Sequence, residues 1–182
     1  KVFVSGDLMT KSNDSAAGGL FQMLGDKGVR MIAEPGSDFF MFLARLHPNM
    51  FFGRKSKPAA NAALTVNMLA IRRGLYSLVR PTHAWLPLPN TDAVLKRASK
   101  DLGLETNGTA VLIVGSALHH WETLPLDGLV LTACWGCDNG LISESIIRQN
   151  REIPTLFHYD DGTPIDDRRV ASFAFRMQRS RA

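Results

Sequence analysis

The sequence has only two cysteines among its 182 residues, Cys134 and Cys137, which excludes the disulfide framework of small secreted domains. It also has no stretch close to the roughly 20 apolar residues that span a bilayer. Neither an initiator methionine nor a signal segment stands at Lys1. We therefore expect a reduced, cytoplasmic protein that does not enter a membrane, and we expect the sequence to be a lobe of a larger protein.

Two common nucleotide-binding motifs are also missing. No G-x-G-x-x-G follows the first predicted strand, and no G-x-x-x-x-G-K-[ST] occurs, so neither a dinucleotide fingerprint nor a P-loop is present. The net charge of +4 comes from separate basic clusters without interleaved aromatic residues. That pattern is typical of a solvated surface, and we expect no nucleic-acid partner.

Alternating strand and helix patterns are the main structural signal. Short β-branched or apolar runs predict buried strands, and amphipathic segments between them predict helices. The strands are expected at 1–5, 29–33, 128–133 and 153–157, and the main helices at 16–26, 91–102, 140–149 and 165–179, with a further helix around Phe40 and Leu46. This order predicts one α/β domain over residues 1–182, with a flavodoxin-like or Rossmann-like parallel sheet and helices on both faces.

Two segments are less regular. Residues 48–89 interrupt the alternation with a stretch rich in Pro, Gly and Lys, followed by a long helix that carries apolar residues on one face. We interpret this segment as a helical insertion. Residues 110–114 are β-branched, so propensity alone favours a strand there.

The loop around the two cysteines is the most informative candidate site. It follows a predicted strand and enters a helix, and such loops are the usual ligand sites in open α/β sheets. Asp138 or Asn139 could cap the helix from residue 140, so Cys137 would precede a helix N-terminus that favours a thiolate. The spacing also fits a redox pair, half of a zinc site, or two small buried side chains.

Further polar residues are predicted near the same edge. Gly6, Asp7 and Asn13 follow the first strand and could face a substrate, although turn and helix-cap roles fit equally well. His119 and His120 are adjacent, so on a helix they point in different directions and cannot share a metal ion. We expect the two histidines to form a surface pair.

With these segments assigned, the sequence resembles the 2-hydroxyacyl-CoA dehydratases of the 2-hydroxyglutaryl-CoA type and the related CoA-enzyme activases. The similarity lies in the order and spacing of five motifs across nearly the whole chain. These are Val2 to Asp7 with Asn13-Asp14, Met31 to Pro35, Gly108 to His120, Trp135-Gly136-Cys137-x-x-Gly140, and Asp161 to Pro164. The resemblance of Gly108 to His120 to a family helix overrides the strand expected at 110–114.

The resemblance implies an iron–sulfur function. Trp135-Gly136-Cys137 looks like the family's Phe-Gly-Cys, whose cysteine binds a [4Fe–4S] cluster, so Cys137 is the implied metal ligand and Trp135 and Gly136 the implied cluster neighbours. Cys134 stands where the family usually has Pro and has no implied role. The other implied cluster ligands belong to a preceding lobe or a partner subunit.

The resemblance therefore implies a lobe that helps to carry a low-potential electron toward an acyl-CoA-type substrate. The isolated chain is expected to be inactive as a lyase or reductase. The alternative hypothesis is a structural or partner-binding lobe that has lost the cluster, with an exposed apolar patch used by the missing lobe or by a second copy in a homodimer.

Overall fold

The computed structural model describes residues 1–83, 88 and 90–179. It divides into two compact units. The sheet unit comprises Lys1–Glu34 and Ala93–Ala182, and the helical unit comprises Pro35–Asp92. The helical unit thus includes the predicted insertion together with the helix before it, and residues 84–87 and 89 of that insertion lie outside the described residues.

The sheet unit is built on four strands. β1 (Val2–Gly6), β2 (Met31–Ala33), β3 (Gly128–Cys134) and β4 (Thr155–Asp160) lie in the order β2-β1-β3-β4, and every pair is parallel. The predicted α/β fold with a parallel sheet is therefore confirmed. β4 extends beyond the expected run at 153–157, so His158 and Tyr159 lie within the strand.

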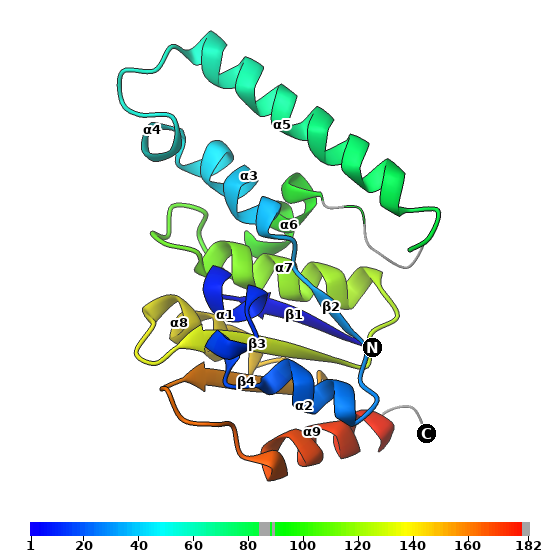
Figure 1. The fold of residues 1–182 in the computed structure, drawn as a ribbon. Helices are drawn as coiled ribbons and strands as arrows, with labels where there is room; N and C mark the ends of the chain where they lie inside the picture. The colour runs from blue at the N-terminus through cyan, green and yellow to red at the C-terminus, as the bar shows by residue number, and fades with distance from the viewer. Residues whose placement is uncertain (84–87, 89, 180–182) are drawn as a thin grey trace. The chain divides into compact units, whose positions relative to one another are not determined.

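Helices cover both faces of this sheet (Figure 1). On one face lie a 3-10 turn η1 (Ser15–Ala17), α2 (Leu20–Asp26) and α9 (Asp167–Arg179), and on the other lie α7 (Ala110–Thr123) and α8 (Asp138–Ile147). The short α1 (Leu8–Ser12) contacts the carboxyl end of β3. α6 (Thr91–Ala98) precedes α7. Asp7 has the helix-cap role considered from the sequence, because it caps α1 by accepting bonds from Met9 N–H (2.9 Å) and Thr10 N–H (3.3 Å).

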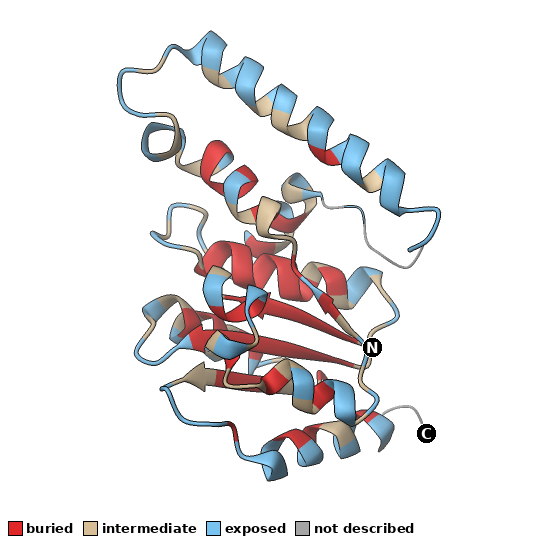
Figure 2. Cartoon of the chain, viewed as in Figure 1, coloured by how far each residue is buried: buried red, intermediate tan, exposed pale blue. Residues whose placement is uncertain are grey.

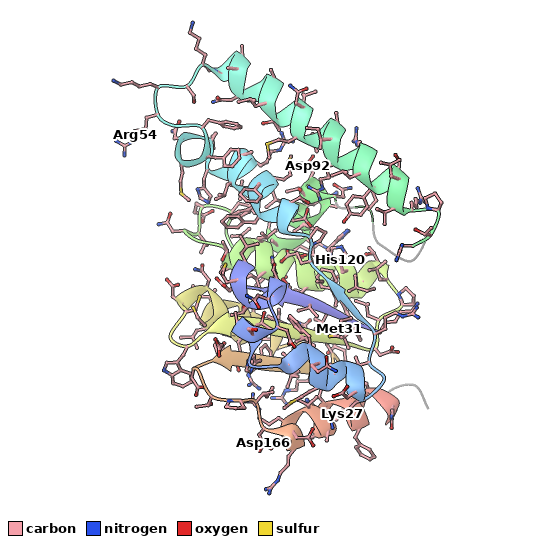
Figure 3. The ribbon with its side chains drawn as sticks, in the orientation of Figure 1. Lys27, Met31, Arg54, Asp92, His120 and Asp166 are labelled. Atoms are coloured by element: carbon pink, nitrogen blue, oxygen red, sulfur yellow. The ribbon has the colours of Figure 1, made fainter. Side chains whose placement is uncertain are left out.

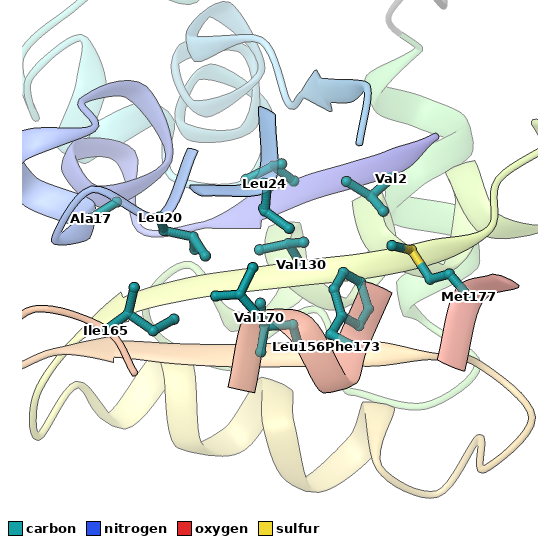
Figure 4. Close-up of a cluster of buried hydrophobic side chains, with 11 residues drawn as sticks. Val2, Ala17, Leu20, Leu24, Val130, Leu156, Ile165, Val170, Phe173 and Met177 are labelled. Carbon is teal, nitrogen blue, oxygen red and sulfur yellow. The ribbon is translucent and has the colours of Figure 1, made fainter. Parts of the chain in front are cut away.

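Two apolar cores follow from the two-residue period of the strands. Val2 and Val130 face α2 and α9, whereas Phe3 and Leu129 face α7 and α8. Figure 4 shows the first core, in which Phe173 and Val170 of α9 pack beneath the sheet. This burial of both faces explains why apolar side chains lie on both faces of β1 and β3.

The β-branched segment 110–114 is helical, as the family resemblance implied. α7 is buried from Ala110 to Leu118, so it must present apolar side chains around most of its circumference. A helix buried in this way carries the same residues as a buried strand. Propensity therefore points to the wrong element here.

The helical unit contains α3 (Gly36–Leu46), α4 (Pro48–Phe51) and the long α5 (Pro58–Val79). A buried ion pair joins Arg72 of α5 to Asp38 of α3. Most of α5 is otherwise exposed (Figure 2). Arg54 projects from the loop between α4 and α5 (Figure 3).

Among the helices of the described residues, each is too short or too polar to cross a membrane.

Candidate functional site at the carboxyl edge of the sheet

The candidate site lies where the strand order reverses. The chain passes from β1 to β2 on one side and later enters β3 on the other side of β1. In open α/β sheets, ligands bind outside the carboxyl ends of the strands at such a switch point. Here the loops after β1 and β3 meet.

β1 and β3 approach each other closely at this edge. Gly6 has a φ of 137°, and a Cβ on it would lie 1.9 Å from the carbonyl oxygen of Thr132, so only glycine fits. The next residue continues this contact, because Asp7 N–H donates to the same carbonyl at 2.8 Å. Thr10 of α1 then hydrogen-bonds to the Thr132 hydroxyl at 3.0 Å. These contacts hold the first loop against the end of β3.

The cysteine loop is a tight turn. Cys137 N–H donates to the carbonyl of Cys134 at 3.2 Å, and Gly136, at the third position, has a φ of 75°. This hydrogen bond with a positive φ at the third position defines a type II β-turn, which requires a residue such as glycine there. Trp135 is anchored through its backbone, donating to Asp160 at 2.9 Å, while its side chain is 74% exposed.

The turn leads directly into α8. Cys137 is the N-cap residue, and the helix begins at Asp138 rather than at 140. Neither Asp138 nor Asn139 caps this helix as expected. Asn139 instead reaches the start of α7, where its Oδ1 accepts from Thr109 N–H at 2.9 Å and from Ala110 N–H at 3.2 Å. Asn139 thus ties the cysteine loop to the neighbouring helix.

The two cysteines and Asp7 come together at the edge. Cys134 is exposed and Cys137 is partly exposed. Desolvation, the adjacent Cys137 and the carboxylate of Asp7 raise the pKa of the Cys134 thiol. The structure therefore brings together two of the predicted positions, Asp7 and Cys137, and adds Cys134 to them.

Asn13 and Trp135 occupy outer positions on the loops. Asn13 ends α1 and its Oδ1 accepts from Ser15 N–H at 3.0 Å, which is the turn role considered from the sequence. The indole of Trp135 is exposed.

Behind the cysteine turn, Tyr159 supports α8. Its hydroxyl donates to Glu144 Oε2 at 2.5 Å, and desolvation together with this carboxylate raises the pKa of Tyr159. Glu144 also pairs with Arg148. Tyr159 and Glu144 are therefore held by each other and by Arg148, and neither is a free acid or base.

A buried ion pair, not predicted from the sequence, fixes the other side of the first loop. Lys11 of α1 pairs with Glu34, which follows β2, and their side chains are 1% and 0% exposed. Ser5 adds a hydrogen bond to Glu34 Oε2 at 3.1 Å. Nothing in the sequence linked these positions, because the pairing depends on β1 and β2 being neighbours.

The histidine prediction is corrected. His120 is buried, stacks on Phe3 with ring centroids 4.1 Å apart, and lies 2.8 Å from the carbonyl of Ser116. Figure 3 shows it on α7. Desolvation lowers the pKa of both His119 and His120. His120 is thus a core residue and not half of a surface pair.

For metal chemistry, the thiols are the relevant donors. Across the part of the chain that the structure describes, no three His, Cys, Asp or Glu side chains gather in a way that could hold a metal ion. The two adjacent thiols can supply at most two ligands, whereas a [4Fe–4S] cluster takes four protein ligands.

No protein-family model, curated protein or solved structure matches this chain.

Proposed function

We propose that this chain is a cytoplasmic lobe of an iron–sulfur protein of the 2-hydroxyacyl-CoA dehydratase and activase-related type. The observation that supports the proposal best is the position of Cys137. It is the N-cap of α8, at the switch-point edge, with a partly exposed thiol. A thiolate there would be one ligand of a [4Fe–4S] cluster completed by another lobe or subunit.

The residues around Cys137 have distinct supporting roles in this proposal. Gly136 permits the turn that precedes the partly exposed Cys137, and Asn139 fixes the loop against α7. Trp135 would cover the cluster from the partner side, and Asp7 and Asn13 would face the acyl-CoA-type substrate. Gly6, predicted to share this role, is buried and instead packs against Thr132 of β3. When bound, such a cluster supplies a low-potential electron. The isolated chain would not complete the reaction.

The test is anaerobic purification of the full-length protein with its partner. We expect iron and sulfide in the purified protein, and we expect Cys137→Ser to lose them together with the cluster's electron paramagnetic resonance signal. Cys134→Ser is the matched control and should retain the cluster. Absence of iron and sulfide from the parent protein, or an unchanged spectrum in Cys137→Ser, would refute the proposal.

A second candidate function is a partner-binding lobe that acts as a homodimer. Its support is a stripe of apolar side chains on α5, which we call the α5 stripe: Leu64, Met68, Ile71, Leu75 and Leu78. Four of these five are more than half exposed. Their alternating spacing of four and three residues is the seam of a coiled coil.

A second copy is the occupant that this spacing favours. Leu64 and Leu78 lie seven residues on either side of Ile71, and Met68 and Leu75 lie three and four residues from it. An antiparallel copy would therefore bring Leu64 near Leu78 and Met68 near Leu75. Such an interface is isologous, as in most homodimers. The helical unit has seven basic and two acidic residues, so the copies repel each other and salt should strengthen the dimer.

Light scattering after size exclusion tests this second function. Leu75→Lys should convert dimers to monomers, whereas Met50→Lys, the same change at an exposed apolar residue outside the stripe, should not. A monomer at all salt concentrations, or a dimer that survives Leu75→Lys, excludes this interface.

A further inference from the structure

Cys134 and Cys137 are placed at a distance that a disulfide can span. They occupy the first and fourth positions of the type II turn, closed by the hydrogen bond from Cys137 N–H to the Cys134 carbonyl at 3.2 Å. The Cα atoms at these positions of a β-turn lie less than about 7 Å apart, and disulfides join Cα atoms roughly 4.4–6.8 Å apart. The backbone therefore needs little or no movement to form the bond.

Both cysteines are also accessible. Cys134 is exposed and Cys137 is partly exposed. A small oxidant can reach the exposed Cys134, and Cys137 is then the adjacent thiol that can resolve the product. These are the only two cysteines in the sequence, so no other thiol of the chain competes.

We propose that Cys134 and Cys137 form a reversible disulfide, and that hydroperoxides are the class of oxidant. Attack of the Cys134 sulfur on hydrogen peroxide breaks the O–O bond, gives a sulfenic acid and releases one water. Attack of the Cys137 sulfur on that sulfenic sulfur forms the S–S bond, breaks the S–O bond and releases a second water. The two thiols lose two electrons and two protons, and the peroxide is reduced to two waters.

The disulfide would regulate the site described above. While it exists, Cys137 has no thiolate to offer to a metal, so oxidation would block cluster loading and reduction by a dithiol would restore it. This consequence rests on the proposed function. The disulfide itself does not, because it needs only the turn and an oxidant.

The experiment uses the iron-free chain, fully reduced and then exposed to a stoichiometric amount of hydrogen peroxide. We expect a monomer whose mass is lower by two hydrogens, both thiols lost to alkylation, and full recovery with dithiothreitol. Two thiols that remain open to alkylation, or disulfide-linked dimers in place of the monomer, would overturn the proposal.

Two sets of variants sharpen this test. Cys134→Ser and Cys137→Ser should each stop at a sulfenic acid or form linked dimers. Gly136→Ala should slow closure, because a residue with a Cβ is strained at a φ of 75°. Circular dichroism confirms that each variant is folded. If Gly136→Ala unfolds, the equilibrium of the Cys134–Cys137 disulfide with glutathione in the parent chain provides a second measurement. Closure as fast in folded Gly136→Ala as in the parent would show that the turn does not direct the reaction.

The outcome is separable from that of the cluster experiment. A disulfide in the iron-free chain with no cluster in the parent protein supports this inference alone. A cluster that depends on Cys137, with no disulfide, supports the proposed function alone.

Discussion

The sheet unit and the helical unit place their apolar side chains differently. The sheet unit buries two apolar cores, one on each face of its sheet, whereas the helical unit exposes most of the α5 stripe. Their charges differ as well. The sheet unit has 14 basic and 15 acidic residues, which gives it a net charge of −1. The helical unit has seven basic and two acidic residues, which gives it a net charge of +5. The first unit therefore buries its apolar side chains internally, while the second leaves most of an apolar stripe exposed.

Each unit also contains a buried ion pair, and these pairs provide the largest expected effect. Lys11→Met leaves Glu34 charged and buried without its cation, which should cost about 3–5 kcal/mol of unfolding free energy. Arg72→Met should cost less, because its pair with Asp38 is slightly more exposed. Hydrogen exchange measured peptide by peptide reports the stability of each unit separately.

The control for this prediction is the double variant Lys11→Met with Glu34→Leu. Because it removes both charges, it should recover most of the lost stability. If Lys11→Met destabilises the helical unit as strongly as the sheet unit, the two units do not unfold independently.

Apolar truncations test the contrast between buried and exposed side chains. Phe173→Ala should cost about 3–5 kcal/mol, because it opens a cavity in the core beneath β3. Leu75→Ala, on the α5 stripe, should change the stability of the monomer by no more than about 0.5 kcal/mol. Urea unfolding at low protein concentration measures both, and a large loss for Leu75→Ala would mean that the stripe is buried in the folded protein.

A medium effect is expected where the cysteine loop joins the sheet unit. Asn139→Ala removes the acceptor for two N–H groups at the start of α7, which should cost about 0.5–2 kcal/mol. Asn139→Asp keeps an oxygen acceptor and is the matched control. Equal losses in thermal unfolding for both variants would show that the side chain acts through packing instead.

The smallest expected effect is on the pH dependence of the stability of the sheet unit. Desolvation lowers the pKa of His120 and of His158, so the folded state favours their neutral forms. The stability they contribute is complete above the unfolded pKa of about 6.5 and is lost as pH falls from there through the folded pKa. His120→Asn should flatten this decline in urea titrations between neutral and acidic pH. An unchanged slope would exclude His120 as its source.

Much of the fold could be predicted because the strands are short apolar runs and the helices between them are amphipathic. The position of Cys137 just before a helix was also predicted, since a strand followed by glycine and polar residues marks such a loop. The residues that Lys11, Asn139 and His120 contact could not be predicted. Each contacts a residue distant in the sequence: Glu34, Thr109 and Phe3.

The sequence by itself determined the alternation of elements, the buried strands and the placement of two cysteines in a strand-to-helix loop, because these depend on local periodicity and on glycine. Only the tertiary structure decided the strand order, and with it which loops are neighbours at the carboxyl edge. It also decided that the apolar face of α5 is exposed, because periodicity shows that a face exists and packing alone determines what covers it.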